Sequence, residues 1–142
     1  MSPEEFQVVE LRIPNKPEYV SVARLTLSGI ASRMNFSYDE VEDLKIAIAE
    51  ACTNAIQHAY GEDKGIEEEV IIRYLINPQK LIIEVQDKGR GFDPDIIGKG
   101  PPGLDTEGGL GIFLIKALVD EVKFKVNKEG GTQVQMIKYR KE

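Results

Sequence analysis

The apolar positions of the chain follow two spacings, one typical of strands and one typical of helices. Residues 6–13 alternate in part and are rich in Val, which predicts a strand ending at Pro14. Later apolar runs on either side of the turns NPQK and KEGG predict two pairs of adjacent strands. Between and after these, apolar residues recur every three or four positions and predict helices. The predicted strands are 6–13, 70–76, 81–87, 121–127 and 132–139, and the predicted helices are 17–34, 37 to about 60, and 110–120.

This order, β-α-α-β-β-α-β-β, predicts an α+β two-layer sandwich with a mixed, mostly antiparallel sheet and helices on one face. A chain of 142 residues that is 42% hydrophobic is long enough to bury one core and short for two. We therefore expect residues 1–142 to form a single domain.

The second helix combines a clear start signal with an unusual polar line. Ser37 and Glu40 have the spacing of a capping box. The apolar stripe runs from Val41 to Ala59, whereas Glu50, Asn54 and the single histidine, His58, lie four residues apart on a line that faces away from it. Taken alone, this line is typical of a solvated helix face.

Composition restricts the class of protein. The net charge of -6 and the pI of about 5.0 argue against a broad basic surface for direct nucleic-acid binding. No segment has the apolar length of a membrane span or the h-region of a signal peptide, so no membrane contact is expected. Cys52 is the only cysteine and fits packing in a reducing compartment, so we expect a cytoplasmic protein.

One stretch has no periodicity. Between Gly89 and Gly111 lie eight of the 13 glycines and three of the seven prolines. A loop of this length inside a compact domain is typically a functional lid or a disordered segment. We expect residues 92–107 to close over a ligand.

Three clusters around this loop suggest what the ligand is. The GGLG stretch precedes a helix, and unpaired N–H groups at a helix N-terminus bind phosphate. Asp87 ends a strand beside the tight turn formed by Gly89 and Gly91, where a carboxylate can accept a hydrogen bond from a base. Asn54 offers a neutral oxygen to Mg²⁺. Together these features predict a nucleoside triphosphate site.

The same clusters resemble a known family. EACTNAIQHA is similar to the N box, DKGRG to the G1 box and GGLG to the G2 box of the GHKL ATPase superfamily, whose Bergerat fold has the predicted element order. Over almost its whole length the chain resembles the anti-sigma-factor serine kinases, closest to their general-stress, sigma-B branch.

The resemblance implies a role for each matching residue. Glu50 would be the general base, Asn54 the Mg²⁺ ligand and Asp87 the adenine contact, while Arg24 would contact protein partners. The loops around ATP would be shaped by Gly89, Gly91, Gly109, Leu110 and Gly111, and Thr132 would close the adenine end. Some relatives carry a basic residue where this chain has Glu107, so here Mg²⁺ and backbone amides would neutralise the phosphates.

The resemblance also implies partners: a sigma factor, a STAS-type anti-anti-sigma factor as substrate, and a second copy in a homodimer. One alternative is a switch kinase of the same family that phosphorylates a STAS scaffold and binds no sigma factor. Another is a module that binds nucleotide without catalysis, against which Glu50 argues. His58 and Arg24 also fit ordinary surface residues.

Overall fold

The computed structural model describes residues 5–56, 69–87, 107–126 and 131–141, with only the backbone described for 107–110. Within these ranges the elements follow the predicted order. They are β1 (Gln7–Pro14), η1 (Pro17–Tyr19), α1 (Val20–Arg33), α2 (Tyr38–Asn54), β2 (Glu69–Ile76), β3 (Lys80–Asp87), α3 (Glu107–Leu118), β4 (Glu121–Val126) and β5 (Thr132–Tyr139).

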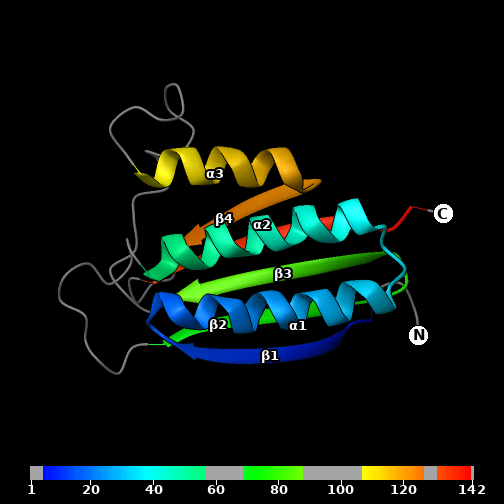
Figure 1. Ribbon diagram of the computed structural model, residues 1–142, viewed down its shortest axis with the longest axis horizontal. Coiled ribbons are helices and arrows are strands. Elements are labelled where there is room, and N and C mark those ends of the chain that lie inside the picture. Colours follow the sequence, from blue (N-terminus) through cyan, green and yellow to red (C-terminus); the bar gives the residue numbers. More distant parts are fainter. Residues whose placement is uncertain (1–4, 57–68, 88–106, 127–130, 142) are drawn as a thin grey trace.

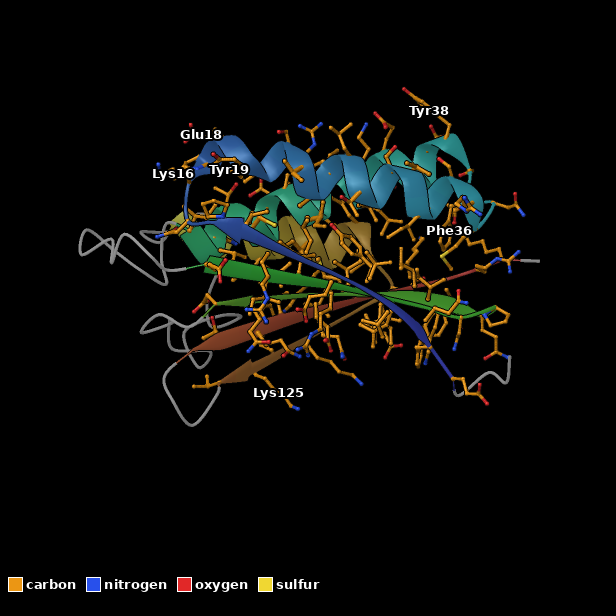
Figure 2. The ribbon with its side chains drawn as sticks, turned by 90° about the horizontal axis from the view of Figure 1, so that it is seen from below. Lys16, Glu18, Tyr19, Phe36, Tyr38 and Lys125 are labelled. Carbon is orange, nitrogen blue, oxygen red and sulfur yellow. The ribbon has the colours of Figure 1, made fainter. Side chains whose placement is uncertain are left out.

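The strands form one sheet in the order β1-β2-β3-β5-β4. Each of these four pairings is antiparallel, so the described sheet is more regular than the mixed, mostly antiparallel sheet expected. All three α-helices cover the same face, with α2 between α1 and α3 (Figure 1). Lys125 projects from the opposite, uncovered side (Figure 2). The predicted two-layer α+β fold is confirmed.

The core lies between α2 and the sheet. The described part of the predicted apolar stripe, from Val41 to Ala55, is buried, including Leu44 and Ile48, which are fully enclosed. Burying one such side chain contributes about 1.5–3 kcal/mol. Cys52 is buried in the same layer, and burial raises the pKa of its thiol to about 12, as suits a packing residue. The Tyr74 hydroxyl donates a 2.8 Å hydrogen bond to the carbonyl of Ala23, which ties β2 to α1.

The capping box at the start of α2 is present as predicted. The Ser37 side chain accepts a hydrogen bond from the Glu40 amide at 3.1 Å, and the Glu40 carboxylate accepts one from the Ser37 amide at 2.9 Å. The Ser37 backbone bond is the main reason why the pKa of Glu40 lies below its usual value. The cap therefore stabilises the fold at neutral pH and loses strength as the pH falls through the pKa of Glu40 in the folded protein.

Replacing the cap serine tests this contribution. Ser37→Ala should lower the free energy of unfolding by about 1 kcal/mol, the usual value of a lost N-cap. Urea unfolding followed by circular dichroism would measure the change. Ser32→Ala, at an exposed serine inside α1, is the matched control and should leave the midpoint unchanged or slightly raised, because alanine is the better helix former. Equal stability of the two variants would contradict a stabilising cap.

Candidate functional site

Glu50 and Asn54 of α2 lie against the first turns of α3. A β-carbon added at Gly111 would come within 2.9 Å of Glu50 Oε2 and 3.1 Å of Asn54 Nδ2. The predicted N-box and G2-box residues, far apart in sequence, are therefore neighbours. Glu50 is half-buried, and only 6% of Asn54 is exposed. The polar line that the sequence places away from the apolar stripe is therefore covered at Asn54, because α3 packs along α2.

Asp87 and Thr132 form a second buried cluster at the junction of β3 and β5. The Thr132 hydroxyl donates to Asp87 Oδ2 at 2.6 Å, and the Thr132 amide donates to Asp87 Oδ1 at 3.3 Å. Asp87 is 2% exposed and Thr132 is 5% exposed. The two bonds fix the carboxylate in one orientation, which is what a residue that recognises a polar ligand edge requires.

The two clusters lie at the same end of the molecule. The C-terminal ends of α2 and β3 and the N-terminal ends of α3 and β5 meet there (Figure 1). A ligand at this end can reach a carboxylate and an amide on α2, the amides at the start of α3, and the buried Asp87. The first N–H groups of a helix have no partners within the helix, so those of α3 suit an anion.

The start of α3 differs from the expectation. The helix begins at Glu107, whereas the sequence indicated a start at Leu110 after the glycines. Gly109, Leu110 and Gly111 thus lie inside α3. Glycine weakens a helix by about 1 kcal/mol relative to alanine and is easily taken for a boundary. Ile112 and Ile115 of α3 are buried, and their burial favours the helix despite that penalty.

One further predicted residue, Arg24, lies on a different helix. Arg24 is exposed on α1. Gly89, Gly91, His58 and most of the predicted lid, 92–107, lie outside the described residues. In the ranges that are described, no three His, Cys, Asp or Glu side chains cluster as a metal site. A Mg²⁺ ion held through Asn54 would take its other ligands from water and phosphate oxygens, which is how Mg²⁺ is usually held.

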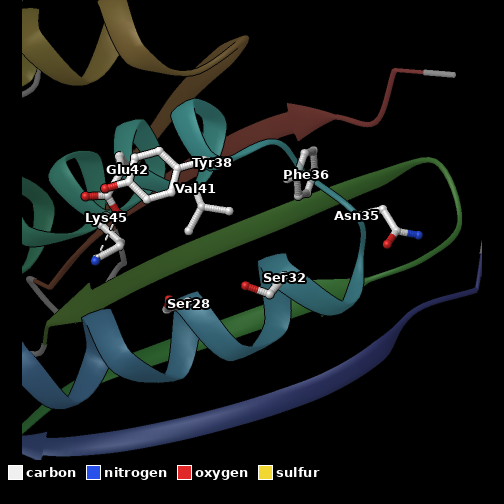
Figure 3. Close-up of a pocket in the computed structure, with 8 residues that line it drawn as sticks. All are labelled: Ser28, Ser32, Asn35, Phe36, Tyr38, Val41, Glu42 and Lys45. Carbon is white, nitrogen blue, oxygen red and sulfur yellow. Dashed lines mark hydrogen bonds and ion pairs between the residues drawn. The ribbon is translucent and has the colours of Figure 1, made fainter.

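A groove of about 600 Å³ lies between α1 and α2 at the other end of the helices (Figure 3). Glu42 and Lys45 form an ion pair of 3.0 Å on its wall. It is lined by Ser28, Ser32, Asn35, Phe36, Tyr38, Val41, Glu42 and Lys45. None of the predicted site residues lines it, so it is distinct from the site described above.

The comparisons with known proteins identify the family of the chain. The model of the histidine kinase-like ATPase domain matches residues 13–138, so the chain belongs to that family. Its relatives include the serine-protein kinase RsbW of Bacillus subtilis strain 168, 49% identical over 92% of this chain and 84% of the relative. RsbW of Bacillus pumilus is 46% identical over 96% of this chain and 88% of the relative. RsbW of Listeria monocytogenes serotype 4a is 48% identical over 94% of this chain and 88% of the relative.

Within the histidine kinase-like ATPases, the chain therefore belongs to the RsbW serine-protein kinases, and the predicted family is confirmed. A solved structure supports the fold. The crystal structure of the RsbU and RsbW domains of a Mycobacterium tuberculosis protein matches with a TM-score of 0.66 at 18% identity, over 93% of this chain and 31% of that chain.

Proposed function

We propose that this protein is a cytoplasmic serine kinase that uses ATP and Mg²⁺ to phosphorylate a STAS-type anti-anti-sigma factor, and that it also sequesters a sigma factor. The observation that carries the proposal is the junction of α2 and α3, where Gly111 lies against Glu50 and Asn54. Membership in the RsbW family supports the same activity. In the parts of the chain that the structure describes, no helix could span a membrane.

The proposed reaction transfers the terminal phosphoryl group of ATP. The serine oxygen of the substrate forms a bond to the γ-phosphorus while the bond to the β–γ bridging oxygen breaks, leaving ADP. Glu50 accepts the serine proton. Such a reaction needs little covalent help, so correct positioning and charge neutralisation supply most of the acceleration. Mg²⁺, held through Asn54, would neutralise charge on the phosphates.

The adenine end of the nucleotide is assigned to the sheet. Asp87 accepts a hydrogen bond from the base amino group, and Thr132 holds that carboxylate through the 2.6 Å bond. The free amides of the first turn of α3, which reaches Gly109, bind the phosphates, and Leu110 and Gly111 lie in the next turn. The turn predicted at Gly89 and Gly91 follows Asp87 in the sequence and lies outside the described residues. Base and phosphates are thus held by separate elements, so changes at either end can be tested independently.

The role of Asp87 can be tested by removing its charge. Asp87→Asn should weaken ATP binding about 10- to 100-fold, because a hydrogen bond to a charged group contributes about 1.5–3 kcal/mol. Isothermal titration calorimetry measures the affinity. Glu84→Gln is the matched control, because Glu84 lies on the same strand and faces the uncovered side, where it binds Gln133 and Gln135. Equal ATP affinity in both variants would remove Asp87 from the site.

The two proposed activities should separate by mutation. Glu50→Ala should reduce phosphotransfer by about 10²–10⁴-fold, the usual contribution of a positioned base, and should leave ATP and sigma-factor binding intact. Arg24→Ala should weaken partner binding and leave ATP affinity intact, because Arg24 is exposed on α1. Phosphorylation assays with a STAS protein and pull-down with a sigma factor measure these effects.

Arg33→Ala, at an exposed arginine near the end of α1, is the control for charge loss at position 24. Full phosphotransfer by Glu50→Ala would show that Glu50 is an ordinary helix-surface residue. If the unmodified kinase phosphorylates a STAS scaffold and captures no sigma factor, the protein is the switch kinase of the alternative reading.

The homodimer is assigned to the uncovered face of the sheet. An apolar band crosses four strands along the paired positions Val8, Leu75, Ile82 and Ile137. Leu81 and Ile83 belong to the core under the helices, and Ile82 between them does not. Because successive side chains of a strand point to opposite faces, Ile82 lies on the uncovered face. Val8 is 57% exposed and Leu75 is partly exposed, whereas Ile82 and Ile137 are 8% and 4% exposed, so the accessible part of the band lies on β1 and β2. A second copy related by a two-fold axis would cover this band with its own.

A charge placed in the band tests the dimer. Val8→Asp should shift the protein from dimer to monomer, because an unpaired carboxylate would be buried at the contact. Sedimentation velocity measures the mass. Val22→Asp, at an exposed valine on α1 in the opposite layer, is the matched control and should remain dimeric. If Val8→Asp keeps the mass of the control, the sheet face is not the dimer contact.

A further inference from the structure

Gly111 is a glycine that the helix backbone does not require. It lies within α3, and its backbone is outside the left-handed region that favours glycine. Glycine in a helix interior is less favourable than alanine, because it has more conformational freedom to lose on folding. The reason for glycine at this position therefore lies beside the helix and not in its own conformation.

The space beside Gly111 is filled by the side chains of α2. An added β-carbon would lie 2.9 Å from Glu50 Oε2, 3.1 Å from Asn54 Nδ2 and 3.4 Å from Asn54 Oδ1. The first distance is shorter than a van der Waals contact between carbon and oxygen. Gly29 of α1 shows the opposite situation, because an added β-carbon there would meet no atom within 4 Å.

We infer that Gly111 is a positioning residue for phosphotransfer: its missing side chain leaves the space in which the Glu50 carboxylate lies. The inference rests on the proposed role of Glu50 as the base. The amides that begin α3 are assigned to the phosphates, so α3 sets the position of the phosphates. Through Gly111, the same helix also sets the position of the Glu50 carboxylate. The contact between α2 and α3 thus fixes the distance between base and transferred group.

The test is the variant Gly111→Ala. The nearest atom is the end of a flexible side chain, so the carboxylate can move aside and the protein should fold with an undiminished melting temperature. Phosphotransfer should fall about 10- to 100-fold, since a displacement near 1 Å can cost about 10²-fold in rate. ATP affinity at saturating Mg²⁺ should stay unchanged. The matched control Gly29→Ala should keep both the rate and the ATP affinity of the unmodified protein.

A double-mutant cycle shows whether the effect passes through Glu50. When Glu50→Ala has already removed the carboxylate, adding Gly111→Ala should cause no further loss of rate. If Gly111→Ala alone does not fold, adding Glu50→Ala should restore folding, because it removes the closest contact. A double variant that remains unfolded would overturn the inference.

Other outcomes separate this inference from the proposed function. Loss of activity in Glu50→Ala with full activity in Gly111→Ala would overturn the positioning role and leave the base role standing. Full activity in Glu50→Ala would overturn the base role itself. Two results would assign Gly111 to nucleotide binding and overturn the positioning role. One is a loss of ATP affinity in Gly111→Ala as large as its loss of rate. The other is a further loss of rate when Gly111→Ala is added to Glu50→Ala.

Discussion

The packing of α2 is the constraint on which the rest of the structure depends. This helix lies between the sheet and two neighbouring helices, so it must be buried on more than one side. Its small buried residues, Ala47, Ala51 and Cys52, allow this close approach. The same packing encloses Asn54, which would otherwise be a solvated amide. One helix therefore supplies both the centre of the core and one wall of the site.

The site has two parts because the two layers of the fold end together. The helix layer brings Glu50 and Asn54 against Gly111, and the sheet layer brings Asp87 against Thr132. Side chains placed on helices and strands are held more precisely than side chains on loops. A nucleotide lying across this end would touch both layers, which suits a reaction that depends on positioning.

Much of the fold could be predicted from local signals. The hairpin β2–β3, the capping box at Ser37 and the final strand β5 agree closely with the predicted positions. The sequence predicts too late a start for α3 because glycine is typical of a helix boundary, whereas the burial of Ile115 favours a helix that continues through the glycines. The burial of Asn54 was missed because its own helix gives no sign of a neighbour.

The sequence by itself determined the order of the elements, the helix start at Ser37 and the identities of the polar residues at the site. Periodicity and capping act between residues a few positions apart, so they can be recognised without a structure. Only the tertiary structure decided that β5 lies between β3 and β4, that Thr132 binds Asp87 from 45 positions away, and that Gly111 faces Glu50. These contacts depend on the order of strands and on the packing of one helix against another, which no local pattern specifies.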